Sequence, residues 1–240
     1  MEQRLQKILS NYGVASRRKA EQMILDRRVR VNGNTASLGD AADDEEDVIE
    51  VDGVRLKKQP ARIVLMLNKP RGYVCTLSDE KGRKNVAELV SGCGARVYPV
   101  GRLDLNSEGL LLLTNNGELS RMLELPQNGW SRRYKVKVHG RVSQNKIDSL
   151  TGGVTIDGIN YGPVKIVSGE SQGTNSWLTI TLQEGKNREI RRLMKHVGLE
   201  VARLIRLSYG PFQLGGLKKG EVREVPQKVL KEQLGEKFKL

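Results

Sequence analysis

Apolar positions in the first 35 residues follow a helical spacing and then a strand spacing. Residues 5–14 carry one apolar helical stripe, which Gly13 interrupts. Ser16 is placed to cap a second helix, because its hydroxyl can accept a hydrogen bond from an amide of the first turn. Residues 28–33 then alternate basic and apolar side chains and end in Asn-Gly, a signal for a tight hairpin. This part of the chain therefore predicts two helices and a hairpin.

Strand patterns dominate the chain after residue 62. Residues 63–67, 98–100 and 110–113 are short apolar runs, typical of strands buried on both faces. Residues 133–138 and 176–182 alternate strictly, and 201–207 is a further predicted strand. Helical patterns cover 118–125, 143–150, 187–197 and 228–239, with Ser143 and Asn187 as expected caps. Residues 56–60 are a predicted linker between domains at 1–58 and 59–240.

The net charge of +13 indicates a polyanionic partner, and its distribution adds detail. Residues 1–60 carry 11 basic and 11 acidic side chains, so residues 61–240 hold the entire excess. Within the neutral segment, the first 35 residues have eight basic and three acidic side chains, while residues 36–54 have eight acidic and none basic. Five consecutive carboxylates at 43–47 cannot converge on one ion, so we expect a solvated loop there that repels RNA.

Several classes of protein are disfavoured by what the chain contains. Its two cysteines, Cys75 and Cys93, are not spaced as a metal-binding pair, and its two histidines are far apart, so no metal site is expected. No apolar run approaches the roughly 20 residues of a membrane span. Neither a P-loop nor a Gly-x-Gly-x-x-Gly motif occurs, so no cofactor is expected. We expect a cytoplasmic monomer without a membrane segment.

The strongest candidate for chemistry is Asp104, in a polar, glycine-bounded loop between two apolar runs. If the loop is extended, its carboxylate points away from the side taken by Leu103 and Leu105. A carboxylate at the end of a buried strand is well placed for catalysis. An aspartate that only caps a turn is the ordinary alternative. The residue pattern by itself leaves both interpretations open.

The catalytic signature of RsuA/RluB-type pseudouridine synthases, which act on ribosomal RNA, resembles residues 101–112, Gly-Arg-Leu-Asp-Leu-Asn-Ser-Glu-Gly-Leu-Leu-Leu. The resemblance, closest to the large-subunit enzymes, implies that Asp104 is the catalytic aspartate and that Arg102 contacts the substrate. Residues 132–136 resemble the second motif of the family, which implies that Tyr134 stacks on the target base. The alternative role for Tyr134 is that of a core residue, because it shares a strand face with Val136 and Val138.

A basic cluster at residues 186–192 resembles the third motif of the family. Three of its arginines lie at i, i+3 and i+4 of the predicted helix, where their charges oppose the helix dipole, so an anionic partner explains them better than helix stability. The resemblance implies that Arg191 pairs with Asp104 and that the substrate contacts Lys186, Arg188 and Arg192. Leu204 and Leu207 would line the base pocket, with a core role as the alternative for both.

Two further resemblances imply RNA contacts. Residues 68–72 match the Lys-Pro-x-Gly segment that opens the catalytic domain, so Lys69 and Arg71 are expected phosphate contacts. Residues 4–7, 15–18 and 29–33 resemble the small RNA-binding domain found in ribosomal protein S4 and in tyrosyl-tRNA synthetases. The RNA-binding candidates there are Arg4, Lys7, Ser16, Arg17, Arg18, Lys19, Arg28, Arg30 and Asn32.

The expected fold class is α+β, with a small α+β RNA-binding domain followed by a mainly antiparallel-sheet pseudouridine synthase domain with flanking helices. The expected function is isomerisation of a uridine in ribosomal RNA to pseudouridine, with large-subunit RNA as the favoured substrate. Asp104 would act on a nucleotide that is flipped out of its helix. A noncatalytic RNA-binding or ribosome-assembly factor would use the same basic residues. A metal-dependent nuclease is disfavoured, because no second carboxylate cluster accompanies Asp104.

Overall fold

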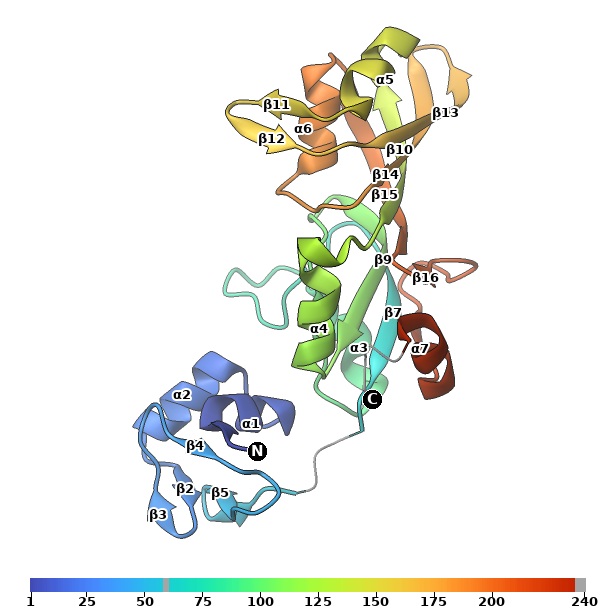
Figure 1. Ribbon diagram of the computed structural model, residues 1–240. Coiled ribbons are helices and arrows are strands. Elements are labelled where there is room, and N and C mark those ends of the chain that lie inside the picture. Colours follow the sequence, from blue (N-terminus) through green and yellow to red (C-terminus); the bar gives the residue numbers. More distant parts are fainter. Residues whose placement is uncertain (58–60, 236–240) are drawn as a thin grey trace. The chain divides into compact units, whose positions relative to one another are not determined.

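The computed structural model describes residues 1–57 and 61–235, and the chain forms two compact units (Figure 1). The small unit comprises Met1–Arg62 with Cys93–Arg96 and Asn115–Gly117. The large unit comprises Ile63–Gly92, Val97–Thr114 and Glu118–Leu240. The expected order of a small α+β domain and a larger sheet domain is confirmed. The expected boundary after residue 58 falls outside the described residues.

Two helices and short strands build the small unit. Ser16 caps the second helix as predicted, since its Oγ accepts a hydrogen bond from the Lys19 amide at 3.3 Å. The predicted hairpin also forms, with Asn32 and Gly33 both at positive φ. Leu5, Ile8 and Leu9 of the first helix pack into the hydrophobic core of the small unit. The elements are β1 (Gln3–Arg4), α1 (Leu5–Asn11), α2 (Arg17–Leu25), β2 (Val29–Val31), β3 (Asn34–Thr35), β4 (Ala41–Ala42), β5 (Ile49–Val51) and β6 (Val54–Arg55).

The acidic run of the small unit is an ordered turn next to the hairpin. Asn32 Nδ2 donates to Asp47 Oδ1 at 2.8 Å, and the Val48 amide donates to Asn32 Oδ1 at 2.9 Å. The Asp47 carboxylate also accepts from the Asp43 amide at 2.8 Å. In the described part of the chain, no three His, Cys, Asp or Glu side chains gather as a metal site.

A mainly antiparallel sheet of nine strands dominates the large unit among the described residues, and Val154–Ile156 and Ile159–Tyr161 pair as a separate two-stranded sheet. Seven follow the order β13-β14-β10-β15-β9-β7-β17, while β8 pairs with β9 and β16 with β15. In the described part of the chain, no helix is both long and apolar enough to cross a membrane. The strands are β7 (Val64–Lys69), β8 (Tyr98–Val100), β9 (Ser107–Thr114), β10 (Arg132–His139), β11 (Val154–Ile156), β12 (Ile159–Tyr161), β13 (Lys165–Gln172), β14 (Asn175–Leu182), β15 (Glu200–Tyr209), β16 (Phe212–Gln213) and β17 (Val222–Glu224).

The helices of the large unit confirm most of the predicted segments, with two differences at their starts. Arg188, rather than Asn187, is the N-cap of α6, in a left-handed conformation with φ 52°. Ser143 occupies the N-cap of α5, but its side chain accepts no capping hydrogen bond. Residues 236–239 of the predicted last helix lie outside the described residues. The helices are α3 (Val86–Val90), α4 (Gly117–Glu124), α5 (Gln144–Thr151), α6 (Glu189–His196) and α7 (Gln227–Leu234), with short 3-10 turns at Ser91–Cys93 and Pro126–Asn128.

Strands β9 and β15 form a parallel pair in the middle of this sheet. Gly109 pairs with Arg206, and a Cβ atom on Gly109 would lie 2.3 Å from the Arg206 carbonyl oxygen. Gly109 also has a φ of +98°, which L side chains rarely adopt. A glycine is therefore needed where the two strands meet. This pairing brings the loop that carries Asp104 next to the strand that carries Leu204 and Arg206.

Candidate active site

The loop between β8 and β9 carries Asp104, and a buried lysine hydrogen-bonds to the backbone of this loop. Lys69 is fully buried, and its Nζ donates to the carbonyl oxygens of Pro70, Asp104 and Ser107 at 3.0, 3.2 and 2.9 Å. Burial lowers the pKa of Lys69. The expectation that Lys69 contacts phosphate is wrong, because its ammonium group is inaccessible. It positions the Asp104 loop instead.

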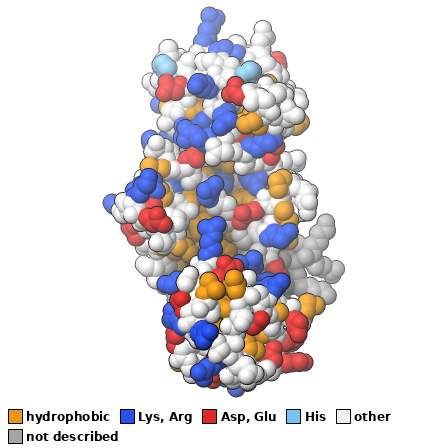
Figure 2. Space-filling model, turned by 90° about the vertical axis from the view of Figure 1, so that its left-hand side faces the viewer, with side chains coloured by type: hydrophobic (Ala, Val, Ile, Leu, Met, Phe, Trp, Pro, Cys, Tyr) orange, Lys and Arg blue, Asp and Glu red, His pale blue; other side chains and the backbone are white. Residues whose placement is uncertain are grey.

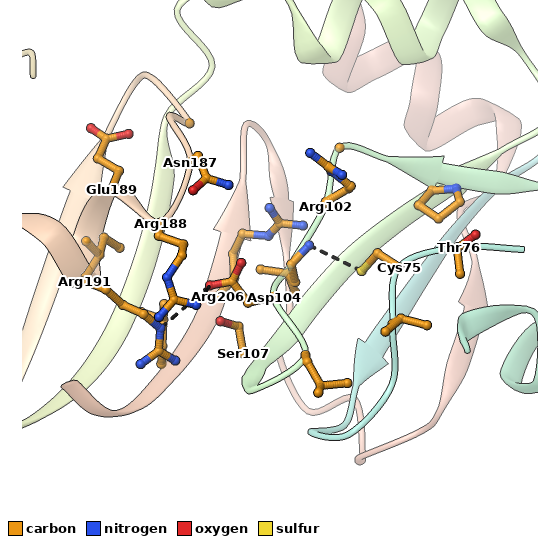
Figure 3. Close-up of a pocket in the computed structure, with 18 of the residues that line it drawn as sticks. Cys75, Thr76, Arg102, Asp104, Ser107, Asn187, Arg188, Glu189, Arg191 and Arg206 are labelled. Carbon is orange, nitrogen blue, oxygen red and sulfur yellow. Dashed lines mark hydrogen bonds and ion pairs between the residues drawn. The ribbon is translucent and has the colours of Figure 1, made fainter. Parts of the chain in front are cut away.

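Two arginines from the start of α6 face the Asp104 carboxylate (Figure 3). Arg191 Nε and Arg188 Nη1 each lie 3.7 Å from Asp104 Oδ2. The Arg191 side chain is 18% exposed and also donates to the Val201 carbonyl at 3.1 Å, whereas the Arg188 side chain is 55% exposed. Burial, Arg188 and the nearby Arg71 lower the pKa of Arg191, and Asp104 opposes them. Arg191 is the more firmly held of the two partners.

Two carboxyl groups lie close together, that of Glu184 after β14 and that of Glu189 at the first residue of α6. Glu189 is buried, its Oε2 accepts from the Lys186 amide at 2.9 Å, and its other oxygen has no partner among the described residues. Burial and the charge of Glu184 raise the pKa of Glu189 to about 7. Glu184 accepts from the Gly162 amide at 2.7 Å and pairs with Lys186, which keep its pKa below the usual value.

The floor of the site comes from inward positions of β10 and β15. Tyr134 and Leu204, 8% and 6% exposed, both line the cavity. Leu207 does not line it, because side chains alternate along β15 and Leu207, three positions after Leu204, lies on the opposite face. The expectation that Leu207 lines the base pocket is therefore wrong.

The cavity has a volume of about 960 Å³ and a basic lining. Figure 2 shows Lys and Arg side chains around the hollowed middle of the large unit, where hydrophobic side chains are visible. Arg102, Lys186, Arg188 and Arg191 line it, and substrate contact by them stays a prediction. Arg192 is exposed on α6 and does not line it, so its expected substrate contact is not supported.

Sequence reasoning missed Arg206 and Cys75, which also line the cavity. Arg206 is 3% exposed, donates from Nε to the Leu110 carbonyl at 2.7 Å, and keeps a buried Nη2 without a hydrogen-bond partner among the described residues. The two-residue strand period could have found it, since Arg206 follows Leu204 by two positions. Cys75 Sγ accepts from the Leu103 amide at 3.3 Å, a contact that the sequence does not signal.

The predicted RNA contacts of the small unit differ in their solvent exposure and in the hydrogen bonds that they make within the unit. Arg17, Arg18, Lys19 and Arg30 are exposed. Arg28 is also exposed, but its guanidinium makes two hydrogen bonds to Asp52, at 2.8 and 2.6 Å. Other candidates make contacts within the unit or are half-buried, and RNA contact by them stays a prediction. These are Arg4, which donates to the Gly39 carbonyl, the cap Ser16, the loop anchor Asn32 and the half-buried Lys7.

Comparison with protein families gives two matches. Residues 63–196 match the family described as RNA pseudouridylate synthase, and residues 3–49 match the S4 domain. A solved structure described as "Crystal structure of pseudouridylate synthase" superposes with a TM-score of 0.68 at 26% identity, covering 97% of this chain and 99% of the other.

Several bacterial proteins are similar over nearly the whole chain. A Rickettsia felis protein named "Uncharacterized RNA pseudouridine synthase" is 43% identical, covering 95% of this chain and 99% of its own. Two proteins are named "Ribosomal large subunit pseudouridine synthase B". The one from Pseudomonas aeruginosa is 40% identical over 97% of this chain and 63% of its own. The one from Bacillus subtilis is 36% identical over 93% and 92%.

Proposed function

Because the chain belongs to the RsuA/RluB-type family of RNA pseudouridine synthases, we propose that it isomerises a uridine of large-subunit ribosomal RNA, with Asp104 as its catalytic carboxylate. The observation that carries the proposal is the Asp104 carboxylate in the basic cavity, 3.7 Å from Arg188 and from Arg191. A turn-capping aspartate would not need two guanidinium groups at its carboxylate.

The geometry fits a reaction that breaks and remakes one glycosidic bond. In the isomerisation the N1–C1′ bond breaks, the uracil turns, and a C5–C1′ bond forms while the C5 proton is transferred to N1. Asp104 has two ways to start it, by attack on C1′ to give a glycosyl ester or by removal of the C2′ proton to give a glycal. Both require a carboxylate anion, and Arg188 and Arg191 balance its charge. Both routes remain part of the proposal.

The cavity suits a nucleotide that has left its helical stack. Extrusion costs a few kcal/mol, which stacking and phosphate contacts can offset. We assign the stacking surface to Tyr134, with Leu204 beside it, and the phosphate contacts to Arg71, Arg102, Lys186 and Arg188. All but Arg71 line the cavity, and Arg71 is exposed and close enough to lower the pKa of Arg191.

The substrate assignment rests on the relatives and on charge. Two relatives are named for the large ribosomal subunit, and the net charge of +13 suits folded RNA. We propose that residues 1–58 recognise the RNA and residues 59–240 carry out the chemistry, in a monomer working in the cytoplasm, where ribosomal RNA is found.

The experiment incubates the protein with transcripts of large-subunit and small-subunit ribosomal RNA, with chelator and no added metal. Pseudouridine is then located by its reaction with a carbodiimide, which blocks reverse transcription. We expect one position in the large-subunit transcript to react. The Asp104→Asn variant, nearly isosteric, should bind the RNA within about tenfold of wild type but convert none. Binding without conversion by wild type would favour the RNA-binding factor, and an Asp104→Asn rate within about a hundredfold of wild type would refute the catalytic assignment.

A further inference from the structure

The strands around Tyr134 have a second face that the catalytic cavity does not use. Side chains alternate along each strand, so the inward set of Tyr134, Leu204 and Arg206 excludes the residues between them. Register places those outward residues in rows across β13, β14, β10 and β15. One row runs Val167, Thr179, Lys135 and Ile205, and each of its members is at least partly exposed.

Half of the outward residues named below are basic. We call this surface the outer basic face and define it by Lys165 and Val167 of β13, Trp177, Thr179 and Thr181 of β14, Arg133, Lys135 and Lys137 of β10, and Arg203 and Ile205 of β15. It holds five cations and no carboxylate, and the exposed Glu200, which pairs with His139 in the strand register, lies just beyond its end. The neighbouring strand β9 adds Glu108, but this side chain is only 4% exposed and is covered by Arg203 and Lys219.

Most of these cations have no carboxylate partner. Arg203 is paired, with Nε 2.6 Å from Glu108 Oε2. Arg133 donates to the Gln213 side-chain oxygen at 3.0 Å, and the Lys135 ammonium lies 4.9 Å from the centre of the Trp177 ring. Lys137 and Lys165 make no ion pair within the described residues. Fold stability does not explain such a concentration of like charge on adjacent strands, because like charges facing each other across strands are destabilising.

We propose that the outer basic face is a second RNA-binding surface, which holds a single-stranded segment of the substrate RNA outside the target site. This rests on the proposed function, because the ligand is the same RNA. Successive lysines on one strand face are about 6.8 Å apart, so they can follow a phosphate backbone. Trp177 and the threonine hydroxyls of β14 add the aromatic and polar contacts that single-stranded RNA uses. An acidic protein would also match the charge, but only a nucleic acid offers bases that can stack on the partly exposed indole of Trp177.

The two surfaces predict a dependence on RNA length. The cavity and the outer basic face lie on opposite sides of the same sheet, because their residues alternate along β10 and β15. A short stem-loop in the cavity therefore does not reach Lys135 or Lys137, while an RNA with a single-stranded extension does. The extension should raise affinity through phosphate contacts, which are sensitive to salt.

The main test compares two double variants with the same change in charge. Lys135→Gln/Lys137→Gln alters the outer basic face, and Lys228→Gln/Lys231→Gln alters exposed positions on α7 as the control. Binding of a bare stem-loop and of the same stem-loop with a 15-nucleotide extension is measured from low to high salt. For the extended RNA we expect the first variant, but not the control, to bind about threefold to tenfold more weakly and to lose about 1.4 from the salt slope, two phosphates at about 0.7 each.

A second readout follows Trp177 directly. The chain has two tryptophans, so Trp130→Phe leaves Trp177 as the only indole. Its fluorescence should change when the extended RNA binds and stay constant with the bare stem-loop. Equal salt slopes for the two double variants, or Trp177 fluorescence that is the same with and without the extension, would refute RNA binding by the outer basic face. Failure of wild type to convert the large-subunit ribosomal RNA transcript would instead refute the proposed function, so the two failures can be told apart.

Discussion

The Asp104 carboxylate has two arginine partners at the same distance, and their surroundings differ. Arg191 is largely buried and tied to the Val201 carbonyl, whereas Arg188 is mostly solvent-exposed. Charges near water are screened and held loosely, while a buried guanidinium keeps its place. The resemblance to the family implied Arg191 as the partner of Asp104, and the structure adds Arg188 as a second, more exposed partner.

We therefore predict unequal losses from neutralising the two arginines. Arg191→Gln should lower kcat/KM by about a hundredfold or more, because a buried charge partner of the catalytic group is lost. Arg188→Gln should lower it by about tenfold or less, mostly through weaker RNA binding. Single-turnover rates at saturating protein separate the two effects, since only a loss at Asp104 persists there. Equal effects under those conditions would contradict the unequal roles.

Among the elements, the parallel pair of β9 and β15 depends on the closest backbone approach. Gly109→Ala would place a methyl group 2.3 Å from the Arg206 carbonyl oxygen, at a positive φ. We predict a loss of about 3 kcal/mol or more in the free energy of unfolding, since neither backbone can move without breaking the pair. Urea denaturation measures it. Gly152→Ala is the control, because no atom lies within 4 Å of its added Cβ, and a similar loss there would refute the explanation.

The start of α6 makes stability depend on pH. Burial raises the pKa of Glu189 to about 7, so the folded protein holds this proton more tightly than the unfolded chain does. The stability from that proton is complete below pH about 4.5 and is lost as pH rises through about 7. Relative to Glu189→Gln, which cannot titrate, wild type should lose up to about 3 kcal/mol of unfolding free energy between those limits.

Urea unfolding of wild type and of Glu189→Gln at pH 4.5, 6 and 8 checks this dependence. Glu232→Gln, an exposed substitution on α7, serves as the matched control and should follow wild type at every pH. A constant difference between wild type and Glu189→Gln across the range would mean that Glu189 titrates no differently in the folded and unfolded states.

In the whole molecule, charge is divided unequally between the two predicted domains. Residues 1–60 are neutral overall, and residues 61–240 carry the +13. The larger part should therefore supply most of the salt-dependent affinity, while the opposed basic and acidic halves of the small unit orient it on folded RNA.

Deleting residues 1–58 tests this division of labour. We predict a folded protein that binds RNA nonspecifically, loses much of its rate on ribosomal RNA, and retains activity on a short stem-loop. The cut precedes β7, so the central sheet keeps its strands. Salt-dependent binding and single-turnover rates on long and short RNAs provide the comparison with wild type. Equal activity of both proteins on every substrate would exclude the small domain from recognition.

Local patterns were enough for what depends on neighbours along the chain. The alternation of residues 133–138 determined which side of β10 holds Tyr134, and Ser16 and Asn32-Gly33 determined a cap and a turn. These features follow from backbone geometry over a few residues, so a sequence contains all the information needed. The motif around Asp104 likewise indicated the candidate site, through its resemblance to a family.

Only the tertiary structure decided what depends on distant segments. The Lys69 ammonium is buried against the carbonyls of Asp104 and Ser107, which lie 35 and 38 residues further along the chain. The residues next to Lys69 in the sequence do not indicate these contacts. The same holds for the hydrogen-bond partner of Arg206, the Leu110 carbonyl, which is 96 residues away in the sequence. Burial and register arise from long-range packing, and they determined which of the basic residues face the Asp104 cavity.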